Sequence, residues 1–280
     1  MSDAAKIRGI LSAYFTRAGL WFGLSFVAQA LAILVGAISV LFARASLEVG
    51  IAVGTISLCA SAGRWRGDVL RGRAEFLLRQ IEYSDGFGWR LDSQLLADAV
   101  SQAIPFEEAA KKRGLEQGNF FASPLAAGPS RALANLREST WWTEQLSKYL
   151  APRATAVLAA IALLSLWSLL IAASLVRNSD PLAISSLLTA TLCLVFSADF
   201  LRLPLGFYQM AADARRINSA ALRESATPLP EERAVLLLMH EYQIDREKGP
   251  VIPDWLWRHR RDYLNDIWAE YGSNEDPPEQ

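Results

Sequence analysis

The chain has 280 residues, of which 52% are apolar and 20% are charged, and its formal net charge is −1. This length allows one large domain or two ordinary ones, and the balanced charge gives no indication of a polyanionic partner. The only two cysteines, Cys59 and Cys193, both fall in apolar stretches, which excludes a disulfide framework and a CxxC metal site. The distribution of charge along the chain is more informative than its sum.

Three stretches lack charged residues over about the length of a membrane span. They are the 26 residues 18–43, the 23 residues 154–176 and the 18 residues 181–198, and a helix needs about 20 apolar residues to cross a bilayer. A fourth stretch, 49–63, has 15 uncharged residues and alone would also fit a buried core helix. Because it follows the first stretch so closely, the pair predicts a helical hairpin. The first stretch is too long for a secretory signal. We therefore expect an all-α membrane protein with four transmembrane helices arranged as two hairpins.

Lysine and arginine lie almost entirely on one side of these spans. Of the 28 such residues, 26 precede the first span, separate the second from the third, or follow the fourth. The positive-inside rule makes these segments cytoplasmic. Both termini and the long middle segment are thus predicted to face the cytoplasm.

The predicted organisation has four parts. They are the N-terminal helix and first hairpin (1–63), a cytoplasmic helical insert (64–153), the second hairpin (154–203) and the cytoplasmic C-terminal helices and tail (204–280). Apolar residues at helical spacing predict the cytoplasmic helices, which cover residues 4–17, 64–84, 92–103, 106–114, 132–150, 205–224, 231–244 and 254–271.

Turn residues mark several predicted helix ends. The stretch Asp85-Gly86-Phe87-Gly88 should end the helix that leaves the second span, and Pro152 should end the helix 132–150. Asp254 is the expected N-cap of the last helix. We expect this helix to pack onto the insert through Trp257, Trp268 and Tyr271.

Motifs that carry enzyme chemistry are absent from the sequence. There is no phosphate-binding loop, no dinucleotide fingerprint and no nucleophile elbow. His240-Glu241 begins like a zinc-protease motif, but residue 244 is isoleucine, so the second histidine ligand is missing. We expect no catalytic residue, no bound metal and no cofactor.

Three residues in the predicted spans are candidates for a role in a pore or its gating. Thr55 and Ser57 lie in a span of mostly small residues, which favours either close helix packing or a conduction path between protomers. Asp199 lies at the edge of the fourth span, where an acidic residue is a functional candidate. A local ion pair with Arg202 is the alternative.

Eight cytoplasmic arginines are candidates for binding a phosphate-bearing ligand. Proteins bind nucleotides and single-stranded nucleic acid with positive charges that contact the phosphate backbone and with aromatic rings that stack on the bases. Solvated surfaces and pairs between subunits give the same composition. The candidates are Arg71, Arg73, Arg79, Arg215, Arg216, Arg258, Arg260 and Arg261.

The predicted order is two spans, an insert, two more spans and a tail, and the tail contains EYQIDREKGPVIPDWLWRHRRDYLN. Together this order and this tail sequence resemble the SMODS-associating four-transmembrane effectors of bacterial anti-phage systems. The matching residues are Gln243, Arg246, Pro250, Pro253, Asp254, Trp255 and Arg261. The stretches FGWRLD and FFASPLAAGPSRALANLRESTWW are similar to the variant paired with a solitary nucleotidyltransferase in Hailong-type systems.

The resemblance implies an effector that depolarises the bacterial inner membrane under the control of a nucleotide or a short single-stranded DNA made by a partner nucleotidyltransferase. In the cyclic-nucleotide systems the ligand activates, whereas in the Hailong type the DNA product holds the effector shut. Four spans are too few for a spacious pore, so we expect a homo-oligomer, with a tetramer as the working hypothesis. The alternative is a non-conducting membrane scaffold or sensor that binds a cytoplasmic protein.

Overall fold

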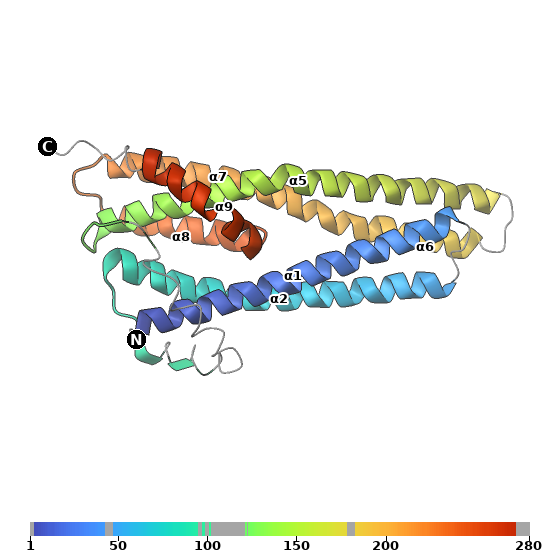
Figure 1. The fold of residues 1–280 in the computed structure, drawn as a ribbon, viewed down its shortest axis with the longest axis horizontal. Coiled ribbons are helices and arrows are strands. Elements are labelled where there is room, and N and C mark those ends of the chain that lie inside the picture. Colours follow the sequence, from blue (N-terminus) through green and yellow to red (C-terminus); the bar gives the residue numbers. More distant parts are fainter. Residues whose placement is uncertain are drawn as a thin grey trace. The chain divides into compact units, whose positions relative to one another are not determined.

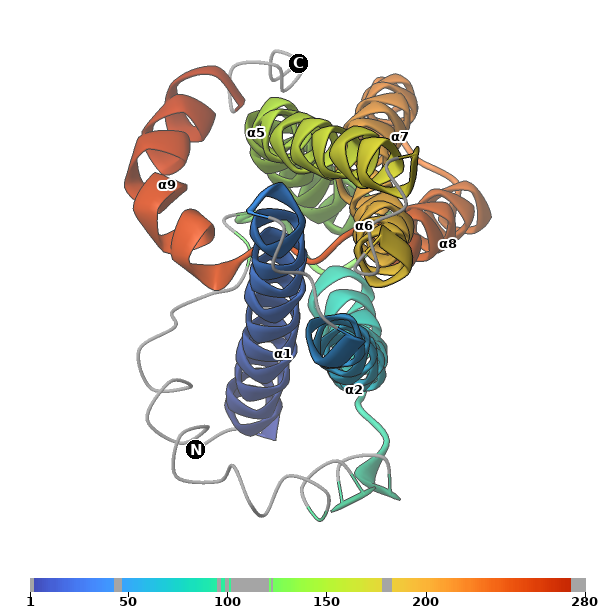
Figure 2. The same cartoon turned by 90° about the vertical axis from the view of Figure 1, so that its right-hand side faces the viewer.

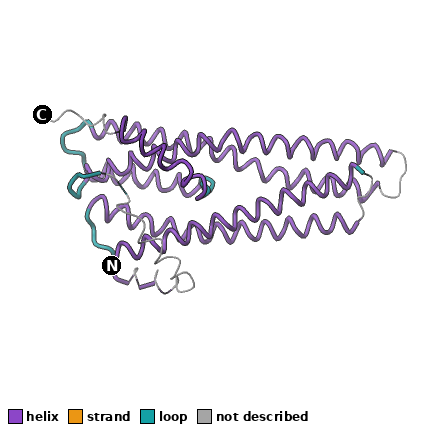
Figure 3. The backbone as a smooth tube through the Cα atoms, in the orientation of Figure 1, coloured by secondary structure: helices purple, strands orange, loops and turns teal. Residues whose placement is uncertain are grey.

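The computed structural model describes residues 3–42, 47–94, 97–98, 101, 121, 123–177 and 183–272. These residues are mostly helical, with no strand among them (Figure 3), which confirms the all-α class for the described part of the chain. The elements are α1 (Asp3–Leu41), α2 (Leu47–Phe87), α5 (Pro129–Arg177), α6 (Ala183–Ala198), the 3-10 turn η2 (Asp199–Leu201), α7 (Arg202–Ser225), α8 (Glu232–Lys248), α9 (Asp254–Ile267) and the final π-helical turn η3 (Trp268–Gly272) (Figure 1).

Two helices are longer than the sequence predicted. The predicted N-terminal helix and first span form one helix, α1. The predicted end at Pro152 is wrong, because α5 continues through this proline for 49 residues in all. Pro152 has no N–H to donate to the carbonyl of Lys148 four residues earlier. At the next residue, Arg153 donates a side-chain hydrogen bond of 2.7 Å to the carbonyl of Tyr149. The predicted helix 106–114 lies outside the described residues, as does half of 92–103.

The chain divides into two compact units. Unit 1 consists of Met1–Gly19, Val69–Lys148 and Gln209–Gln280, and unit 2 consists of Leu20–Asp68 and Tyr149–Tyr208. Each unit has its own apolar core.

In unit 1, the start of α1 packs against the second half of α2. Their apolar side chains form a buried cluster in which Ile7 and Ile81 are fully buried. Burial of a side chain of this size contributes about 1.5–3 kcal/mol to the free energy of folding. Arg8 forms an ion pair of 2.7 Å with Asp85. A second cluster joins α5, α7 and α8 around the buried residues Leu133 and Ile217.

The end of α2 is defined by two glycines, as the sequence predicted. Gly88 has a φ of 74°, a left-handed conformation that suits glycine at the end of a helix, and its N–H donates to the carbonyl of Ser84. Gly86 accepts a hydrogen bond of 2.8 Å from the N–H of Gly128. A Cβ on Gly86 would lie 2.9 Å from the Cβ of Ala132 and 3.0 Å from its Cα. The glycine therefore allows α2 to approach the start of α5.

Helix α9 and the turn η3 that follows it contact α5 through tryptophans; Figure 2 shows the ribbons of α9 and α5. Trp268 lies 5.2 Å from Trp141, and Trp257 lies 6.4 Å from Trp142, measured between ring centroids. This confirms the predicted role of the two tryptophans; the side chain of Tyr271 lies outside the described part.

The predicted N-cap of α9 is wrong by one residue. Pro253 occupies the cap position with an extended backbone, φ −64° and ψ 133°, and makes no side-chain capping bond. The fixed ring of proline suits this position, so that Asp254 becomes the first helical residue. An acidic residue there is still favoured by the helix dipole.

Unit 2 buries several polar side chains within its apolar core and exposes many large apolar ones. Its buried polar side chains are Ser25, Gln29, Ser57, Ser165, Ser168, Ser186 and Thr189. Large apolar side chains are exposed on every described helix of the unit, including Leu24, Leu31, Ile51, Leu58, Leu163, Trp167 and Val195. Soluble domains bury such apolar side chains and rarely leave many of them together on the surface. Two helical stretches of the chain, Ile7–Val40 and Pro129–Ser174, are long and apolar enough to cross a membrane.

Candidate functional site

The most connected group of polar residues in unit 1 is a buried ion network between α2 and α8. Arg246 donates from Nε to Glu75 and from Nη1 to Glu82, both at 2.8 Å. Gln243 donates to the second carboxylate oxygen of Glu82, also at 2.8 Å. Glu75 and Glu82 lie two turns apart on α2, and Gln243 and Arg246 lie one turn apart on α8, so each pair shares one helix face. The two faces therefore meet through charged side chains.

Arg71 extends the network to the end of α8. Its guanidinium donates to the backbone carbonyls of Arg246 and Gly249 and lies 3.9 Å from Glu75. Carbonyls in the last turn of a helix lack partners within the helix and carry the negative end of its dipole. Arg71 therefore caps α8 from a neighbouring helix. With two arginines and two glutamates, the network has no net formal charge.

The network keeps Arg246 charged. Burial alone lowers the pKa of this guanidinium, but the carboxylates of Glu75 and Glu82 outweigh burial and raise the pKa well above its ordinary value. A buried charge that is paired in this way is costly to unpair.

Two tyrosines border the network. The hydroxyl of Tyr242 donates to the carbonyl of Ser139 at 3.0 Å and lies 2.6 Å from the hydroxyl of Thr143. Tyr83 donates to Gln243 at 3.1 Å. Burial raises the pKa of both phenols. A raised pKa in the folded state means that the neutral phenol is stabilising below the ordinary tyrosine pKa and that this stability is lost as pH rises through the folded-state pKa.

We therefore expect unit 1 to lose stability at alkaline pH, with Tyr242 as one cause. The thermal unfolding midpoint should fall above pH about 10, the ordinary pKa of tyrosine, and should fall less steeply in Tyr242→Phe. Tryptophan fluorescence of the purified chain across a pH series measures the midpoint. Tyr263→Phe, at an exposed tyrosine on α9, is the control and should keep the wild-type dependence. An unchanged slope in Tyr242→Phe would contradict the assignment.

The contacts of Arg71, Arg79, Arg215 and Arg216, among the predicted ligand-binding arginines, are with carboxylates or carbonyls of the chain. Besides Arg71 in the network, Arg79 pairs with Glu247, and Arg215 with Glu144 at 2.7 Å. Arg216 pairs with Glu241 at 2.6 Å and with Asp245 at 3.1 Å. An anionic ligand at these arginines would compete with carboxylates that are already in place. Ligand binding by these arginines stays a prediction.

The other four predicted arginines lie on two separate helices. Arg73 is exposed on α2, whereas the other three lie on α9. Arg261 lies over the ring of Trp257 at 5.1 Å, and Arg260 over the ring of Tyr263 at 5.7 Å. With the exposed Arg258, they give α9 a surface on which cations and aromatic rings alternate.

In unit 2, Ser57 is part of a polar chain between α1 and α2. Gln29, which is fully buried, donates to the hydroxyl of Ser57 at 2.9 Å. Ser61 donates to the carbonyl of Ser57 at 3.0 Å, and Arg64 donates to the hydroxyl of Ser61 at 3.1 Å. These contacts lead from a charged residue at the end of the apolar stretch to an amide in its interior.

The other two predicted pore residues are not part of this chain of contacts. Thr55 is exposed, and its hydroxyl donates to the carbonyl of Ile51 at 2.9 Å. Asp199 belongs to η2, and its side chain lies outside the described part. Gln29 was not predicted as a functional residue, because the spans were defined by the absence of charge. An amide within an uncharged stretch nevertheless indicates a polar contact between helices.

Comparison of the chain with protein-family models, with curated proteins and with solved structures finds no match. The geometry does give two residues of the tail motif a physical role, because Gln243 and Arg246 are the α8 side of the ion network. These contacts and the exposed apolar side chains of unit 2 are the features that bear on function.

Proposed function

We propose that the chain is the subunit of an oligomeric inner-membrane channel that acts as an effector in anti-phage defence. In this proposal unit 2 lies in the bilayer as four spans in two hairpins, and unit 1 lies in the cytoplasm. A nucleotide or short single-stranded DNA made by a partner nucleotidyltransferase controls the channel. The single observation that carries the membrane location is the apolar exterior of unit 2, where large apolar side chains are exposed on every described helix.

Lipid is the environment that fits this exterior. Side chains such as Leu24, Leu58 and Leu163 are each about two-thirds exposed, which would be unfavourable in water but is neutral in hydrocarbon. Helices satisfy their own backbone hydrogen bonds, as a membrane span requires. The first and third spans lie within the long helices α1 and α5. We assign the shorter second and fourth spans to the start of α2 and to α6 with η2.

The interior of unit 2 supports a role beyond anchoring. Polar groups between spans are rare and are kept for helix association or for transport. The fully buried Gln29 and its partner Ser57 are such a pair. Four helices cannot enclose a wide pore by themselves, so conduction requires several copies of the chain.

Features of unit 1 support the proposed control of the channel by a ligand. The surface of α9 combines Arg258, Arg260 and Arg261 with neighbouring aromatic rings, a combination that suits phosphates and bases. Helix α2 supplies Ser57 to unit 2 and both glutamates of the ion network to unit 1. A ligand acts on such a channel only if it binds one of two arrangements more tightly than the other.

Flux measurements on the purified chain test the proposal. Reconstituted in liposomes, the chain should conduct ions in one of two conditions, with or without the oligonucleotides or nucleotides extracted from the same preparation. Replacing Arg258, Arg260 and Arg261 together by Gln should weaken this ligand control and leave the conducting state intact. Arg233→Gln, at an exposed arginine on α8, is the control.

The same experiment distinguishes the alternative. A chain that conducts in neither condition and that carries no nucleotide or oligonucleotide in any preparation is not a ligand-controlled channel. Capture of a specific cytoplasmic protein together with that result would favour the membrane scaffold.

A further inference from the structure

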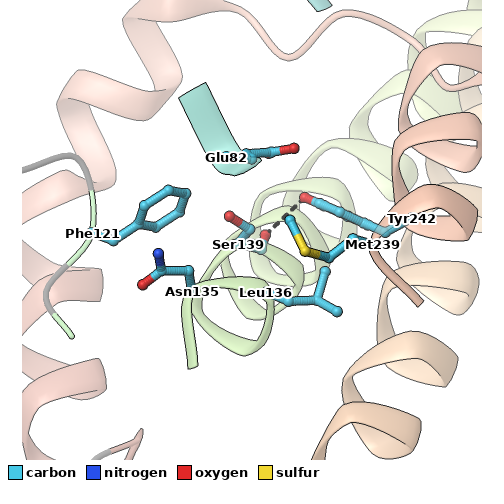
Figure 4. Close-up of a pocket in the computed structure, with 7 residues that line it drawn as sticks. All are labelled: Glu82, Phe121, Asn135, Leu136, Ser139, Met239 and Tyr242. Atoms are coloured by element: carbon cyan, nitrogen blue, oxygen red, sulfur yellow. Dashed lines mark hydrogen bonds between the residues drawn. The ribbon is translucent and has the colours of Figure 1, made fainter. Parts of the chain in front are cut away.

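A small pocket in unit 1 contains a buried amide that no protein group satisfies. The pocket lies among α2, α5 and α8, and it is lined by Glu82, Phe121, Asn135, Leu136, Ser139, Met239 and Tyr242 (Figure 4). Asn135 is only 3% exposed, and neither its side-chain nitrogen nor its side-chain oxygen has a hydrogen-bond partner in the protein. Buried polar atoms in folded proteins almost always have a partner.

Two neighbouring polar groups make hydrogen bonds with residues other than Asn135. Both carboxylate oxygens of Glu82 accept hydrogen bonds from α8. The hydroxyl of Tyr242 contacts the carbonyl of Ser139 and the hydroxyl of Thr143. Asn135 must therefore find its partner in the pocket.

The size and chemistry of the pocket identify this partner. Its volume is about 10 Å³, which is the space that one water molecule needs. Water both donates and accepts, so one molecule can serve the nitrogen and the oxygen of an amide. The carboxylate of Glu82 and the side chain of Ser139, which also line the pocket, offer further hydrogen bonds, and a buried water normally makes about three. An apolar occupant would leave the amide unpaired, and a calcium ion would require six or more oxygen ligands.

We propose that this pocket is a binding site for one ordered water molecule, held by Asn135 and linking α5 to the Glu82 side of the ion network. The site is independent of the proposed channel function. It completes the hydrogen bonding of a region in which α2, α5 and α8 meet.

A structure of the full chain in detergent or nanodiscs, at a resolution that shows water, tests the site directly. Density for a water should lie about 2.7–3.2 Å from the amide of Asn135. A dry pocket around an unmoved Asn135 overturns the proposal, as does an Asn135 side chain that bonds another protein group.

Stability measurements provide a second test. Asn135→Leu keeps the shape of the side chain but cannot hold the water, so the melting midpoint should fall by about 2–6 °C. The control is Ser147→Ala, because Ser147 is also fully buried with an unpartnered hydroxyl but does not line the pocket; its midpoint should stay unchanged or rise. If Asn135→Leu leaves the midpoint unchanged or raises it, as removal of an unpaired amide from a dry pocket would, the proposal is wrong.

Discussion

Replacing Arg246 by methionine is expected to lower the free energy of unfolding of unit 1 by about 3–5 kcal/mol, the cost of breaking a buried ion pair from one side. The variant leaves Glu75 and Glu82 charged and without their 2.8 Å partner. Methionine fills much of the volume of the arginine stem, so the lost charge and not a cavity dominates the effect. Chemical denaturation followed by tryptophan fluorescence measures the difference.

Neutralising Glu82 in the same chain should reverse most of this loss. In the double variant Arg246→Met, Glu82→Gln, the remaining charges of Arg71 and Glu75 balance each other, and a buried network whose charges stay balanced costs far less than one broken from one side. Arg216→Met is the control, because Arg216 is half exposed although it also contacts three carboxylates. Exposed pairs contribute about 0–1 kcal/mol. Equal losses in Arg246→Met and Arg216→Met would mean that burial of the network has no energetic role.

Local sequence signals were sufficient for much of the fold. The apolar spacing of α8 and α9 predicted both helices, because an amphipathic helix encodes its buried face in its own residues. The glycines at 86 and 88 predicted the end of α2, since a left-handed residue is a local requirement. The tryptophans of α9 indicated a packing surface, because large rings gain most from burial.

Contacts between distant segments could not be predicted in the same way. The ligand-binding role of Arg71 stays a prediction, but its contacts with the carbonyls of Arg246 and Gly249, more than 170 residues away in sequence, were not predicted. Charge is normally a sign of exposure, and only the packing of α2 on α8 shows which charged residues are buried. The hydrogen bond between Gln29 and Ser57 could not be predicted either. Ser57 was identified as a candidate from the sequence, whereas Gln29 was not.

The ion network also gives a physical reason for part of the tail motif. Gln243 and Arg246 together hold both oxygens of Glu82, so neither can be changed without leaving that carboxylate short of a partner. Arg71 connects the same region to Gly249, at the start of the loop that leads to α9. A conformational change in this loop would therefore alter the contacts of Arg71 on α2. In the proposed channel, α2 has residues in both units.

Two glycines of α2 in unit 1 should respond in opposite directions to the same substitution. Gly86→Ala is expected to destabilise unit 1 by about 1–3 kcal/mol, the usual cost of overpacking, because the new Cβ would lie 3.0 Å from the backbone of Ala132. Gly72→Ala is the matched control, since a Cβ there meets no atom within 4 Å. Alanine in an unobstructed helix position stabilises by about 0.5–1 kcal/mol.

The comparison separates helix propensity from packing. If propensity alone mattered, both variants would be more stable than the wild type, since both residues are helical. A gain at Gly72 with a loss at Gly86 shows that α2 is held against α5 by a close contact that only glycine permits. Chemical denaturation of the two variants gives both values under one set of conditions, and a gain at Gly86 equal to that at Gly72 would show that the start of α5 does not lie against α2 as described.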